Sequence, residues 1–401
     1  MQEFIHRANL LDAIGGEGEN PQFVHIAGTN GKGTTTAFVQ SILAAHGHTV
    51  GAFFSPYVYD IRERIQLNGA MMSKQEFAAG IAALAQIGEG LNDTEFGGAT
   101  EFELKTALGF RFWKQQNCDW VALEVGLGGR FDATNVITPA TSVIVSIGLD
   151  HTAILGDTLG AIAFEKAGII KPGIPAVIGN VPPEAATVIE RKAHVEGAPI
   201  WRFGDEVRIT ESGEIITPKA QYDGIAPTIP GFHILHNCAL AIASIEATGQ
   251  NLDPKLVKEA INATTVPGRF EVREVHGKRF VLDGAHNADS ASLLASALAK
   301  RYPGQSFSLI TGMVEGHDPA DLYRSIAPPA KHIYACPINF HRARSPEDLT
   351  LSLGELGLAA NTMSAPGDAI RAALDDDSDY VVVTGSFYLV GEIGTLLNSA
   401  V

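Results

Sequence analysis

Cysteine is scarce in this sequence, whose 401 residues include only Cys118, Cys238 and Cys336. The three lie far apart and are odd in number, so they match neither the spacing of a metal site nor a disulfide framework. Disulfides persist in oxidising compartments. We therefore expect a protein of a reducing compartment, the cytoplasm.

Basic residues are outnumbered by acidic ones. The sequence has 29 Lys and Arg residues and 45 Asp and Glu residues, which gives a formal net charge of −16. This balance argues against nucleic-acid or anionic-membrane partners, although a local positive patch can still bind a small anion. No stretch approaches membrane-spanning length, and no basic segment followed by an apolar run marks a secretion signal. The expected partners are small molecules, with no nucleic acid and no membrane.

The pattern of short apolar runs predicts an α/β fold. A hydrophobic fraction of 45% and a charged fraction of 18% describe a compact globular protein, and a chain of this length is expected to form two domains. Strand-like runs alternate with helix-like segments, and this order predicts a mostly parallel sheet with helices on both faces. The strand-like runs are 23–27, 120–125, 142–147 and 176–178, and the helix-like segments include 35–46 and 102–115.

The alternation is interrupted once and then starts again. The segment 196–237 indicates a short antiparallel insertion, followed by a helix at about 236–248. A Pro-Gly break then precedes a second α/β run. Its predicted elements are strands at 279–283, 306–311 and 380–384 and a helix at 288–299. We place the domain boundary at this break, which gives domains of residues 1–267 and 268–401.

A glycine-rich stretch, GTNGKGT, joins the first predicted strand to a helix-like segment. The common phosphate loop has Ser or Thr directly after its lysine, whereas here Gly33 follows Lys32 and the hydroxyl comes at Thr34. Glycines let backbone N–H groups face phosphate oxygens at a helix N-terminus. Lys32 would add a charge for the outer phosphates and Thr34 a hydroxyl for Mg²⁺. A glycine-rich turn with an incidental lysine is the alternative.

Further candidates follow two other predicted strands. Glu124 lies near the end of the run WVALEV, and Asp150 and His151 come just after SVIVSIGL. Ligands of open α/β sheets bind at the carboxyl ends of strands, and Mg²⁺ prefers oxygen donors. Glu124 is therefore a candidate metal ligand, and His151 is expected at the same edge. The alternatives are a surface salt bridge for Glu124 and a structural role for His151.

Four charged residues are ambiguous from spacing alone. Lys166, in AFEKAGIIKPG, fits a solvated lysine at a helix end. Arg269 follows a turn in VPGRFE, and Asp283 and His286 follow a strand in VLDGAHN. Arginine suits bidentate contacts to phosphate, and an aspartate in such a position can accept from ribose hydroxyls. Structural turn residues are an equally good interpretation of these two motifs.

Taken in order, several stretches closely resemble the folylpolyglutamate synthase/dihydrofolate synthase family of the Mur ligase superfamily. They are GTNGKGT, SPYVYDIRERIQLNG, TEFELKTALGF, EVGLGGRFDATN, DHTAILGDTLGAIAFEKAGIIKPG, PGRFE, DGAHN, ARSPEDL and GSFYLVGEI. The resemblance covers nearly the whole chain. It implies an N-terminal Mur-ligase central domain of the P-loop type and a smaller Rossmann-like C-terminal α/β domain. The delayed hydroxyl of Thr34 is the form of phosphate loop seen in this superfamily.

The same resemblance implies a reaction. Such enzymes are ATP-dependent amide ligases, here adding L-glutamate to a folate. The γ-phosphate of ATP passes to a substrate carboxylate, and the amine of the amino acid then displaces phosphate from the acyl phosphate. Phosphate leaves readily and oxide does not, so catalysis consists mainly of positioning and of neutralising charge. The family is usually monomeric, and its ATP site lies between domains, completed when the C-terminal domain closes.

Residue roles follow from the resemblance. The residues implied to bind ATP are Asn30, Gly31, Lys32, Gly33, Thr34, Asn237 near adenine, Arg269 near the phosphates and Asp283 near the ribose. The residues implied to hold Mg²⁺, of which two ions are expected, are Thr34, Ser55, Glu124, His151 and Lys166. Lys166 matches a lysine that the family commonly carbamylates. His286 and Ser386 fall where the incoming glutamate binds, and Lys32, Lys166 and His286 are the expected catalytic residues.

Two departures leave the substrate open. Tyr57 replaces the histidine of the family's SPH motif, and Glu315 and His317 stand where a lysine is usual. A ligase of the same chemistry that acts on another carboxylate is therefore an alternative, as is a nucleotide-binding regulator without turnover. The short stretch before the phosphate loop favours folylpolyglutamate synthase activity, and dihydrofolate synthase activity stays open.

Overall fold

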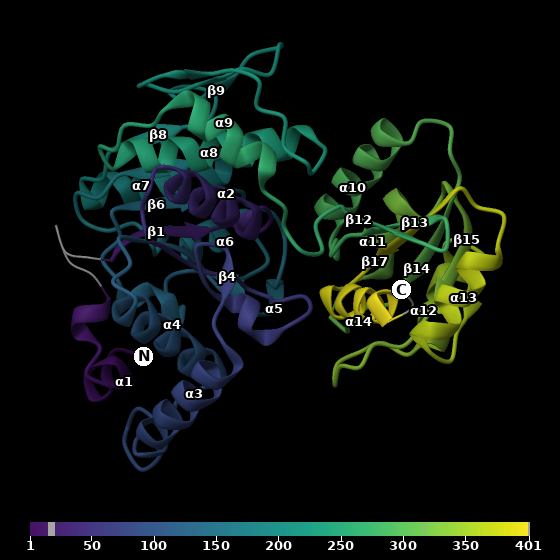
Figure 1. Cartoon of the computed structure of the whole chain (residues 1–401), viewed down its shortest axis with the longest axis horizontal. Helices are drawn as coiled ribbons and strands as arrows, with labels where there is room; N and C mark the ends of the chain where they lie inside the picture. The colour runs from purple at the N-terminus through teal and green to yellow at the C-terminus, as the bar shows by residue number, and fades with distance from the viewer. Residues whose placement is uncertain (15–20, 317, 400–401) are drawn as a thin grey trace. The chain divides into compact units, whose positions relative to one another are not determined.

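The computed structural model describes residues 1–14, 21–316 and 318–399 (Figure 1). Its contacts divide the chain into two compact units. The larger unit comprises Met1–Pro56, Arg62–Thr228 and Phe232–Thr264, and the smaller comprises Tyr57–Ile61, Ile229–Gly231 and the chain from Thr265 onward. The domain boundary at residue 267 stays a prediction, and no sequence pattern signalled the two short segments that join the smaller unit.

An eight-stranded sheet organises the larger unit, in the order β4-β3-β2-β5-β1-β6-β7-β8. The strands from β2 to β8 in this order are parallel, and β3 and β4 add an antiparallel edge. Their bounds are β1 Gln22–Ala27, β2 Val50–Phe53, β3 Ile65–Leu67, β4 Ala70–Met71, β5 Trp120–Glu124, β6 Thr141–Ile144, β7 Ala176–Ile178 and β8 Ile200–Arg202. The predicted α/β class is confirmed. The run at 142–147 forms a shorter strand than predicted, because after Ile144 the chain leaves the sheet beside the phosphate loop.

Helices with local start signals surround this sheet. Ser73 and Thr100 each begin a helix with a reciprocal capping box, in which the glutamate three residues on bonds back to the cap. The α-helices are α1 Gln2–Arg7, α2 Lys32–Ala45, α3 Lys74–Glu89, α4 Glu101–Gln115, α5 Thr152–Leu155, α6 Leu159–Ala167, α7 Pro183–Glu196, α8 Phe232–Ala247 and α9 Pro254–Ala263. Short 3-10 helices are η1 Leu11–Ala13, η2 Ile61–Arg64 and η3 Ala133–Val136.

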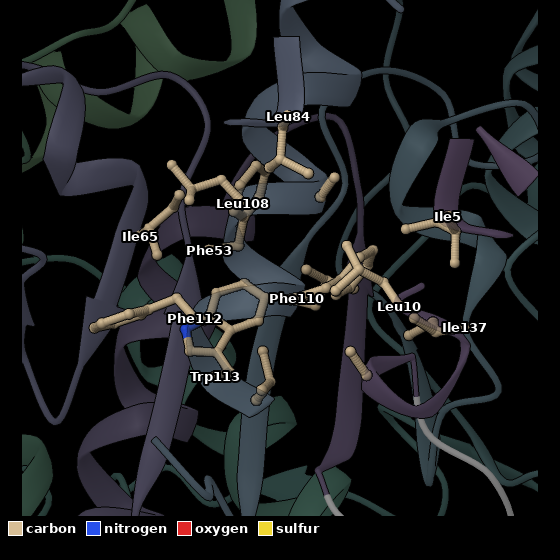
Figure 2. Close-up of a cluster of buried hydrophobic side chains, with 14 of the residues drawn as sticks. Ile5, Leu10, Phe53, Ile65, Leu84, Leu108, Phe110, Phe112, Trp113 and Ile137 are labelled. Atoms are coloured by element: carbon tan, nitrogen blue, oxygen red, sulfur yellow. The ribbon is translucent and has the colours of Figure 1, made fainter. Parts of the chain in front are cut away.

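Aromatic packing joins α4 to the sheet. Figure 2 shows Phe53 of β2 beside Phe110 and Trp113 of α4, in a buried cluster that also takes in residues of α1 and α3. The Trp113 ring lies edge-on to Phe53, with centroids 6.2 Å apart, and its Nε1 donates to the Gln66 carbonyl at 3.0 Å. A Cβ at Gly51 would lie 2.4 Å from this ring. A glycine in β2 is therefore required for the tryptophan to reach the sheet.

The predicted insertion is a small antiparallel sheet of β9 Arg208–Ile209, β10 Ile215–Ile216 and β11 Gln221–Tyr222. Tyr222 anchors it, because its buried hydroxyl donates to Glu246 of α8 at 2.6 Å. Helix α8 begins earlier than the predicted position of 236. No helix within the described ranges combines the length and the apolar character that crossing a bilayer requires.

The smaller unit has a six-stranded sheet in the order β12-β13-β17-β14-β15-β16. Strand β12 is antiparallel to β13, and the remaining pairs are parallel. The strands are β12 Glu271–Val275, β13 Lys278–Leu282, β14 Phe307–Thr311, β15 Ala330–Ala335, β16 Asn361–Thr362 and β17 Tyr380–Thr384. The helices are α10 Ala288–Arg301, α11 Pro319–Ile326, α12 Pro346–Glu355, α13 Pro366–Asp375 and α14 Phe387–Ser399.

A charged network lies at the amino-terminal ends of strands β13, β14 and β17. Lys278, at the start of β13, donates to Asp376 Oδ1 at 2.7 Å, and both side chains are at least nine-tenths buried. Ser308, Ser378 and Tyr334 also donate to the same carboxylate. Burial alone would raise the pKa of Asp376, but the hydrogen bonds from Lys278 and the serines outweigh it and hold the pKa well below its usual range.

Replacing this carboxylate should destabilise the smaller unit. We expect Asp376→Asn to lower the free energy of unfolding by about 3–5 kcal/mol at pH 7, because Lys278 loses its buried partner. Asp377→Asn is the matched control: that side chain is 71% exposed, so its loss should cost at most about 1 kcal/mol. Urea unfolding checks both.

The pH dependence gives a second check on the same variant. The folded pKa of Asp376 is lowered, so its stabilising effect is complete at neutral pH and is lost as the pH falls through that folded value. The difference between wild type and Asp376→Asn should therefore shrink in acid. A difference that stays constant with pH would contradict an ionised Asp376.

Candidate active site

The phosphate loop lies between β1 and α2, as its strand–loop–helix pattern predicts. Gly31 has φ +84°, and a Cβ there would lie 2.8 Å from Asn237 Oδ1, so this position requires glycine. Ser146, after β6, fixes the loop: it accepts from the Asn30 N–H at 2.9 Å and donates to the Asn30 carbonyl at 2.8 Å. These two hydrogen bonds join the phosphate loop to the segment after β6.

Glu124 is buried at the end of β5, with 3% exposure, so it is not a surface carboxylate. Its Oε2 accepts from the Ser55 N–H at 3.0 Å and lies 3.4 Å from where a Cβ on Gly33 would be. The carboxylate thus sits against the first turn of α2, close to Thr34. A longer side chain at Gly33 would press on it.

Asp150 and His151 follow β6, at the same sheet edge as Glu124. The His151 N–H donates to Asp150 Oδ1 at 2.8 Å, and the His151 backbone is left-handed, with φ +51°. His151 is half exposed, whereas the Asp150 side chain is 7% exposed. Sequence reasoning chose His151 and gave its neighbour no role, although the structure buries the aspartate.

Lys166 is buried, with 5% exposure, which contradicts the interpretation as a solvated lysine. Its Nζ donates to the Gly28 carbonyl at 3.0 Å, and Lys32 Nζ donates to that same oxygen at 3.0 Å. Burial first, and then the charge of Lys32, lower the pKa of Lys166 to about 7, while the carboxylates of Asp150 and Asp132 act in the opposite direction. A large fraction of Lys166 is therefore a neutral amine near neutral pH.

The oxygen donors fit a small hard cation. In the described parts of the chain, no three His, Cys, Asp or Glu side chains converge as a metal site. The predicted set around Glu124 instead includes the hydroxyls of Thr34 and Ser55, and Mg²⁺ commonly keeps water in its remaining positions. A buried carboxylate that accepts from the Ser55 N–H and lies against the helix turn carrying Thr34 suits Mg²⁺ on a phosphate.

Asn237, which the family resemblance places near adenine, also belongs to the larger unit. It is buried on α8, with 3% exposure, and its amide lies against Gly31 of the phosphate loop. Sequence reasoning assigned no role to Arg64, whose Nη1 donates to Ser55 Oγ at 3.2 Å and whose guanidinium lies 5.4 Å from the centre of the Phe102 ring. The motif RERIQ carried no spacing that distinguished Arg64 from Arg62.

A cavity of about 620 Å³ opens beside this region, within the larger unit. Phe102, Arg130, Phe131 and Asp132 contribute to its lining. Asp132 is held by N–H groups of Leu127 and Thr134 at 2.8 and 3.0 Å. The motif EVGLGGRFDATN contained these residues, but nothing in the sequence indicated a cavity.

In the smaller unit, the four predicted residues gather around Phe387, at the carboxyl ends of β13 and β17. Arg269 places its guanidinium 4.2 Å from the centre of the Phe387 ring, and the His286 ring is 5.9 Å from it. Ser386 is buried, with its Oγ accepting from the Tyr388 N–H at 3.1 Å.

Asp283 holds the turn that carries Arg269. Its Oδ2 accepts from the Phe270 N–H at 2.8 Å and its Oδ1 from the Ala285 N–H at 3.0 Å. Burial raises its pKa, against the charge of Arg269 and these two hydrogen bonds. A Cβ at Gly284 would lie 2.2 Å from the Phe387 ring, so the glycine of DGAHN is required there. His317 lies outside the described residues.

Comparison with known proteins identifies this arrangement. The model of the Mur ligase middle domain matches residues 26–245, more than half of the chain, and that of the Mur ligase glutamate ligase domain matches residues 268–387. The dihydrofolate synthase/folylpolyglutamate synthase of Bacillus subtilis is 35% identical over 96% of this chain and 92% of its own length. The chain is a Mur ligase of the folylpolyglutamate and dihydrofolate synthase family.

Solved structures agree with this assignment. The folylpolyglutamate synthase of Mycobacterium tuberculosis, solved with ADP and AMPPCP, matches this Mur ligase with a TM-score of 0.90 at 29% identity, over 98% of this chain and 95% of the other. The E. coli FolC protein, solved with DHPP and ADP, matches with a TM-score of 0.87 at 30% identity, over 99% and 92%. A bifunctional folylpolyglutamate synthase/dihydrofolate synthase, solved with Mn, AMPPNP and L-glutamate, has a TM-score of 0.87 at 32% identity, over 99% and 93%.

The lowered pKa of Lys166 in this Mur ligase can be tested by measuring the free energy of unfolding. Lys166 must be desolvated as a cation below pH 7, and this cost disappears as the pH rises from about 7 toward the value for an unfolded lysine. We expect Lys166→Met to be more stable than wild type at pH 6–7 and the difference to shrink by pH 9. Urea unfolding in bicarbonate-free buffer measures it, and a difference that grows with pH would contradict the lowered pKa.

Proposed function

We propose that the phosphate loop and Glu124 of the larger unit bind ATP with Mg²⁺, and that the chain uses this ATP to join L-glutamate to a folate. The protein is an ATP-dependent acid–amino-acid ligase. One observation carries the proposal: Lys32 and Lys166 both donate to the Gly28 carbonyl beside the N-terminus of α2, and the buried Glu124 carboxylate of β5 lies against the first turn of that helix. The charge of Lys32 and the positive end of α2, beside a carboxylate able to bind a metal, suit a triphosphate carrying a divalent cation.

The chemistry proceeds in two balanced steps. A carboxylate oxygen of the folate forms a bond to the γ-phosphorus while the bond from that phosphorus to ADP breaks. The glutamate nitrogen then bonds to the carbonyl carbon of the acyl phosphate, phosphate leaves, and the nitrogen loses a proton. Bound Mg²⁺ supplies neutralisation of phosphate charge, with Thr34, Ser55, Glu124 and His151 as its proposed protein ligands. Lys32 holds the outer phosphates, and the N–H groups of residues 30–34 orient them.

Lys166 is proposed to work as a carbamate. A neutral lysine amine can bond to the carbon of CO₂ and lose a proton, which replaces a cation with an anion. The lowered pKa supplies that neutral amine near pH 7. The change would also convert the repulsion between Lys166 and Lys32 into an attraction, and the new anion could serve a second Mg²⁺.

The other assigned residues take complementary roles. In the smaller unit, Arg269 binds phosphate oxygens and Asp283 the ribose, while His286 and Ser386 receive the incoming glutamate, with His286 placed to accept the proton of its amine. Asn237 of the larger unit is assigned to adenine. Residues 268–401 would then constitute the glutamate-ligase domain.

The cavity of the larger unit is the proposed site for the ring system of the folate. Phe102 offers an aromatic face, Asp132 offers a fixed carboxylate for N–H donors, and Arg130 lies over the Phe131 ring and pairs with Glu165 at the rim. These groups suit a flat heterocycle that carries an amino group. We propose tetrahydrofolylpolyglutamate synthase activity, with dihydrofolate synthase activity as an additional reaction, in a cytoplasmic monomer.

Product analysis tests the function directly. The full-length protein is incubated with ATP, Mg²⁺, L-glutamate and either tetrahydrofolate or dihydropteroate. We expect ADP release to require both the acid and glutamate, and mass spectrometry to show an acid extended by glutamate. Equal ATP turnover without either substrate would refute the ligase, and extension of dihydropteroate would establish the second reaction.

A substitution tests the carbamate. We expect Lys166→Ala to lower turnover by about 10²-fold or more, the size typical for a group that fixes charge at a reacting centre. Excess bicarbonate should not restore activity, whereas a short carboxylate such as acetate should restore part of it by replacing the missing anion. Lys171→Ala is the control, because that lysine donates to the Asn135 carbonyl and has no proposed role. Undiminished activity of Lys166→Ala would exclude the carbamate.

A further inference from the structure

A buried histidine on β1 lies two hydrogen bonds away from the cavity of the larger unit. His25 is fully buried, and its Nε2 lies 2.9 Å from Thr134 Oγ1. Thr134 is also fully buried, and its hydroxyl donates to Asp132 Oδ1 at 2.6 Å. Asp132 contributes to the lining of the cavity. One chain of hydrogen bonds therefore runs from a strand of the sheet to a carboxylate of the cavity.

The direction of each bond follows from the carboxylate. A carboxylate only accepts, so the single proton of the Thr134 hydroxyl points to Asp132. The hydroxyl oxygen then has only lone pairs to offer His25, whose Nε2 must carry a proton. Burial first, and then the charge of Lys171, lower the pKa of His25 to about 3, which keeps the ring neutral at pH 7. A neutral imidazole has one N–H, so its Nδ1 is unprotonated.

The unprotonated nitrogen makes this histidine unfavourable as a core residue. Nδ1 of His25 is buried and has no hydrogen-bond partner among the residues that the structure describes, and an unsatisfied buried polar atom costs free energy. Phe23, on the same face of β1, packs its ring edge-on against Phe110 of α4, with centroids 5.8 Å apart. An apolar side chain next to it would avoid that cost. The bond to Thr134 is the contact that an apolar side chain cannot make.

The two oxygens of Asp132 carry different numbers of hydrogen bonds. Oδ1 accepts from the hydroxyl of Thr134 and from its N–H at 3.0 Å, and Oδ2 accepts from the Leu127 N–H at 2.8 Å. A carboxylate oxygen has two lone pairs. Among the contacts of the described residues, the open acceptor position is therefore on Oδ2, which leaves that oxygen for an N–H donor in the cavity.

The close approach of Thr134 Oγ1 to Asp132 Oδ1 depends on the direction of the hydroxyl. Two oxygens 2.6 Å apart attract when a proton lies between them. With the hydroxyl turned toward His25, the lone pairs of the two oxygens would face each other and repel. Because His25 Nε2 carries a proton, it is no competing acceptor, and the hydroxyl stays directed at the carboxylate.

We propose that Thr134 is a positioning residue for the folate ring: its hydroxyl, directed by His25, occupies Asp132 Oδ1 and so presents Oδ2 to an N–H group of the ligand. The N–H groups of Leu127 and Thr134 locate the carboxylate, and the hydroxyl decides which of its oxygens stays open. The inference rests on the proposed function in one respect, the placement of the folate ring in this cavity.

The first test removes the hydroxyl of Thr134 or keeps it. Thr134→Val retains the shape of the side chain without the hydroxyl, and Thr134→Ser retains the hydroxyl without the methyl group. Thr141→Val is the matched control, because Thr141 is equally buried and its hydroxyl donates to the Pro175 carbonyl at 3.2 Å. For each full-length variant, kcat and the KM values for tetrahydrofolate and for ATP are measured.

We expect Thr134→Val to raise the KM for tetrahydrofolate by about fivefold, the factor that one hydrogen bond contributes, with kcat and the KM for ATP unchanged. Thr134→Ser and Thr141→Val should keep the wild-type KM for tetrahydrofolate. A rise of both KM values, or a fall in kcat alone, would indicate a general loss of structure and would overturn the positioning role. A Thr134→Ser variant as impaired as Thr134→Val would do the same.

A second comparison tests the contribution of His25. His25→Leu removes the donor to the hydroxyl, whereas His25→Gln supplies an amide N–H in the region of Nε2. We expect His25→Leu to raise the KM for tetrahydrofolate by about threefold in wild type and to add nothing in Thr134→Val, because both residues act on one bond. His25→Gln should resemble wild type. An equal rise in both backgrounds would contradict action through Thr134.

The direction of the bonds can be measured without any ligand. Nitrogen NMR of the imidazole rings distinguishes a protonated from an unprotonated nitrogen, and comparison with His25→Gln assigns the signals of His25 among the 13 histidines. We expect a protonated Nε2 and an unprotonated Nδ1 at pH 7. A protonated Nδ1 would show that the Thr134 hydroxyl is not directed as proposed, and the inference would be wrong.

Failure of this inference is distinguishable from failure of the proposed function. If wild type does not ligate glutamate, the proposed function is wrong, and the role of Thr134 toward the folate is wrong with it. If wild type ligates glutamate and Thr134→Val keeps the wild-type KM for tetrahydrofolate, the ligase assignment stands and only the positioning role is refuted.

Discussion

Two lysine side chains that share one carbonyl oxygen constrain the whole active region. Lys32 is tied to the phosphate loop by its own backbone, and Lys166 comes from α6, which follows β6 in the chain, yet both donate to Gly28. Holding two ammonium groups so close, one of them buried, costs free energy. Asp150 and Asp132 offset only part of this, since the pKa of Lys166 still falls to about 7. The arrangement is stabilised by added negative charge, which a triphosphate or a carbamate supplies.

The sheet explains how residues so distant in sequence arrive at one place. Strands β5, β1 and β6 are neighbours in the larger unit, and Glu124, the phosphate loop and Asp150 follow them in that spatial order. Parallel strands present their carboxyl ends at a common edge, so loops after neighbouring strands meet there. The hydrogen bonds of Ser146 to Asn30 then join the β1 loop to the β6 loop. The chemistry is built on rigid elements and fixed by polar contacts between their loops.

In the smaller unit, the residues assigned to substrate binding and those that stabilise the fold lie at opposite ends of the strands. Asp283 and Ser386 follow β13 and β17 at one edge, with Phe387 between Arg269 and His286. At the opposite ends, Lys278 of β13, Ser308 of β14 and Ser378 just before β17 surround Asp376. Glu271 adds a third feature, because it accepts from the Tyr59 hydroxyl and from the Gly268 N–H of the turn before Arg269. A single carboxylate therefore connects a residue from the N-terminal half of the chain to the residues assigned to ATP.

The sequence alone determined the α/β class, the phosphate loop and the family. These features are local. Consecutive residues determine a glycine-rich turn between a strand and a helix, and they also determine the capping boxes at Ser73 and Thr100. Family motifs then assigned candidate residues to each site. Spacing could not determine that Lys166 is buried, because a helix-end lysine has the same pattern whether it faces water or Gly28. The buried Asp150, the contact of Arg64 with Ser55, the cavity beside Asp132 and the membership of residues 57–61 in the smaller unit were decided by tertiary structure. Each of these features depends on contacts between segments that are distant in sequence. Such contacts are stabilised by burial and by hydrogen bonds between segments, so the pattern of one segment does not reveal them.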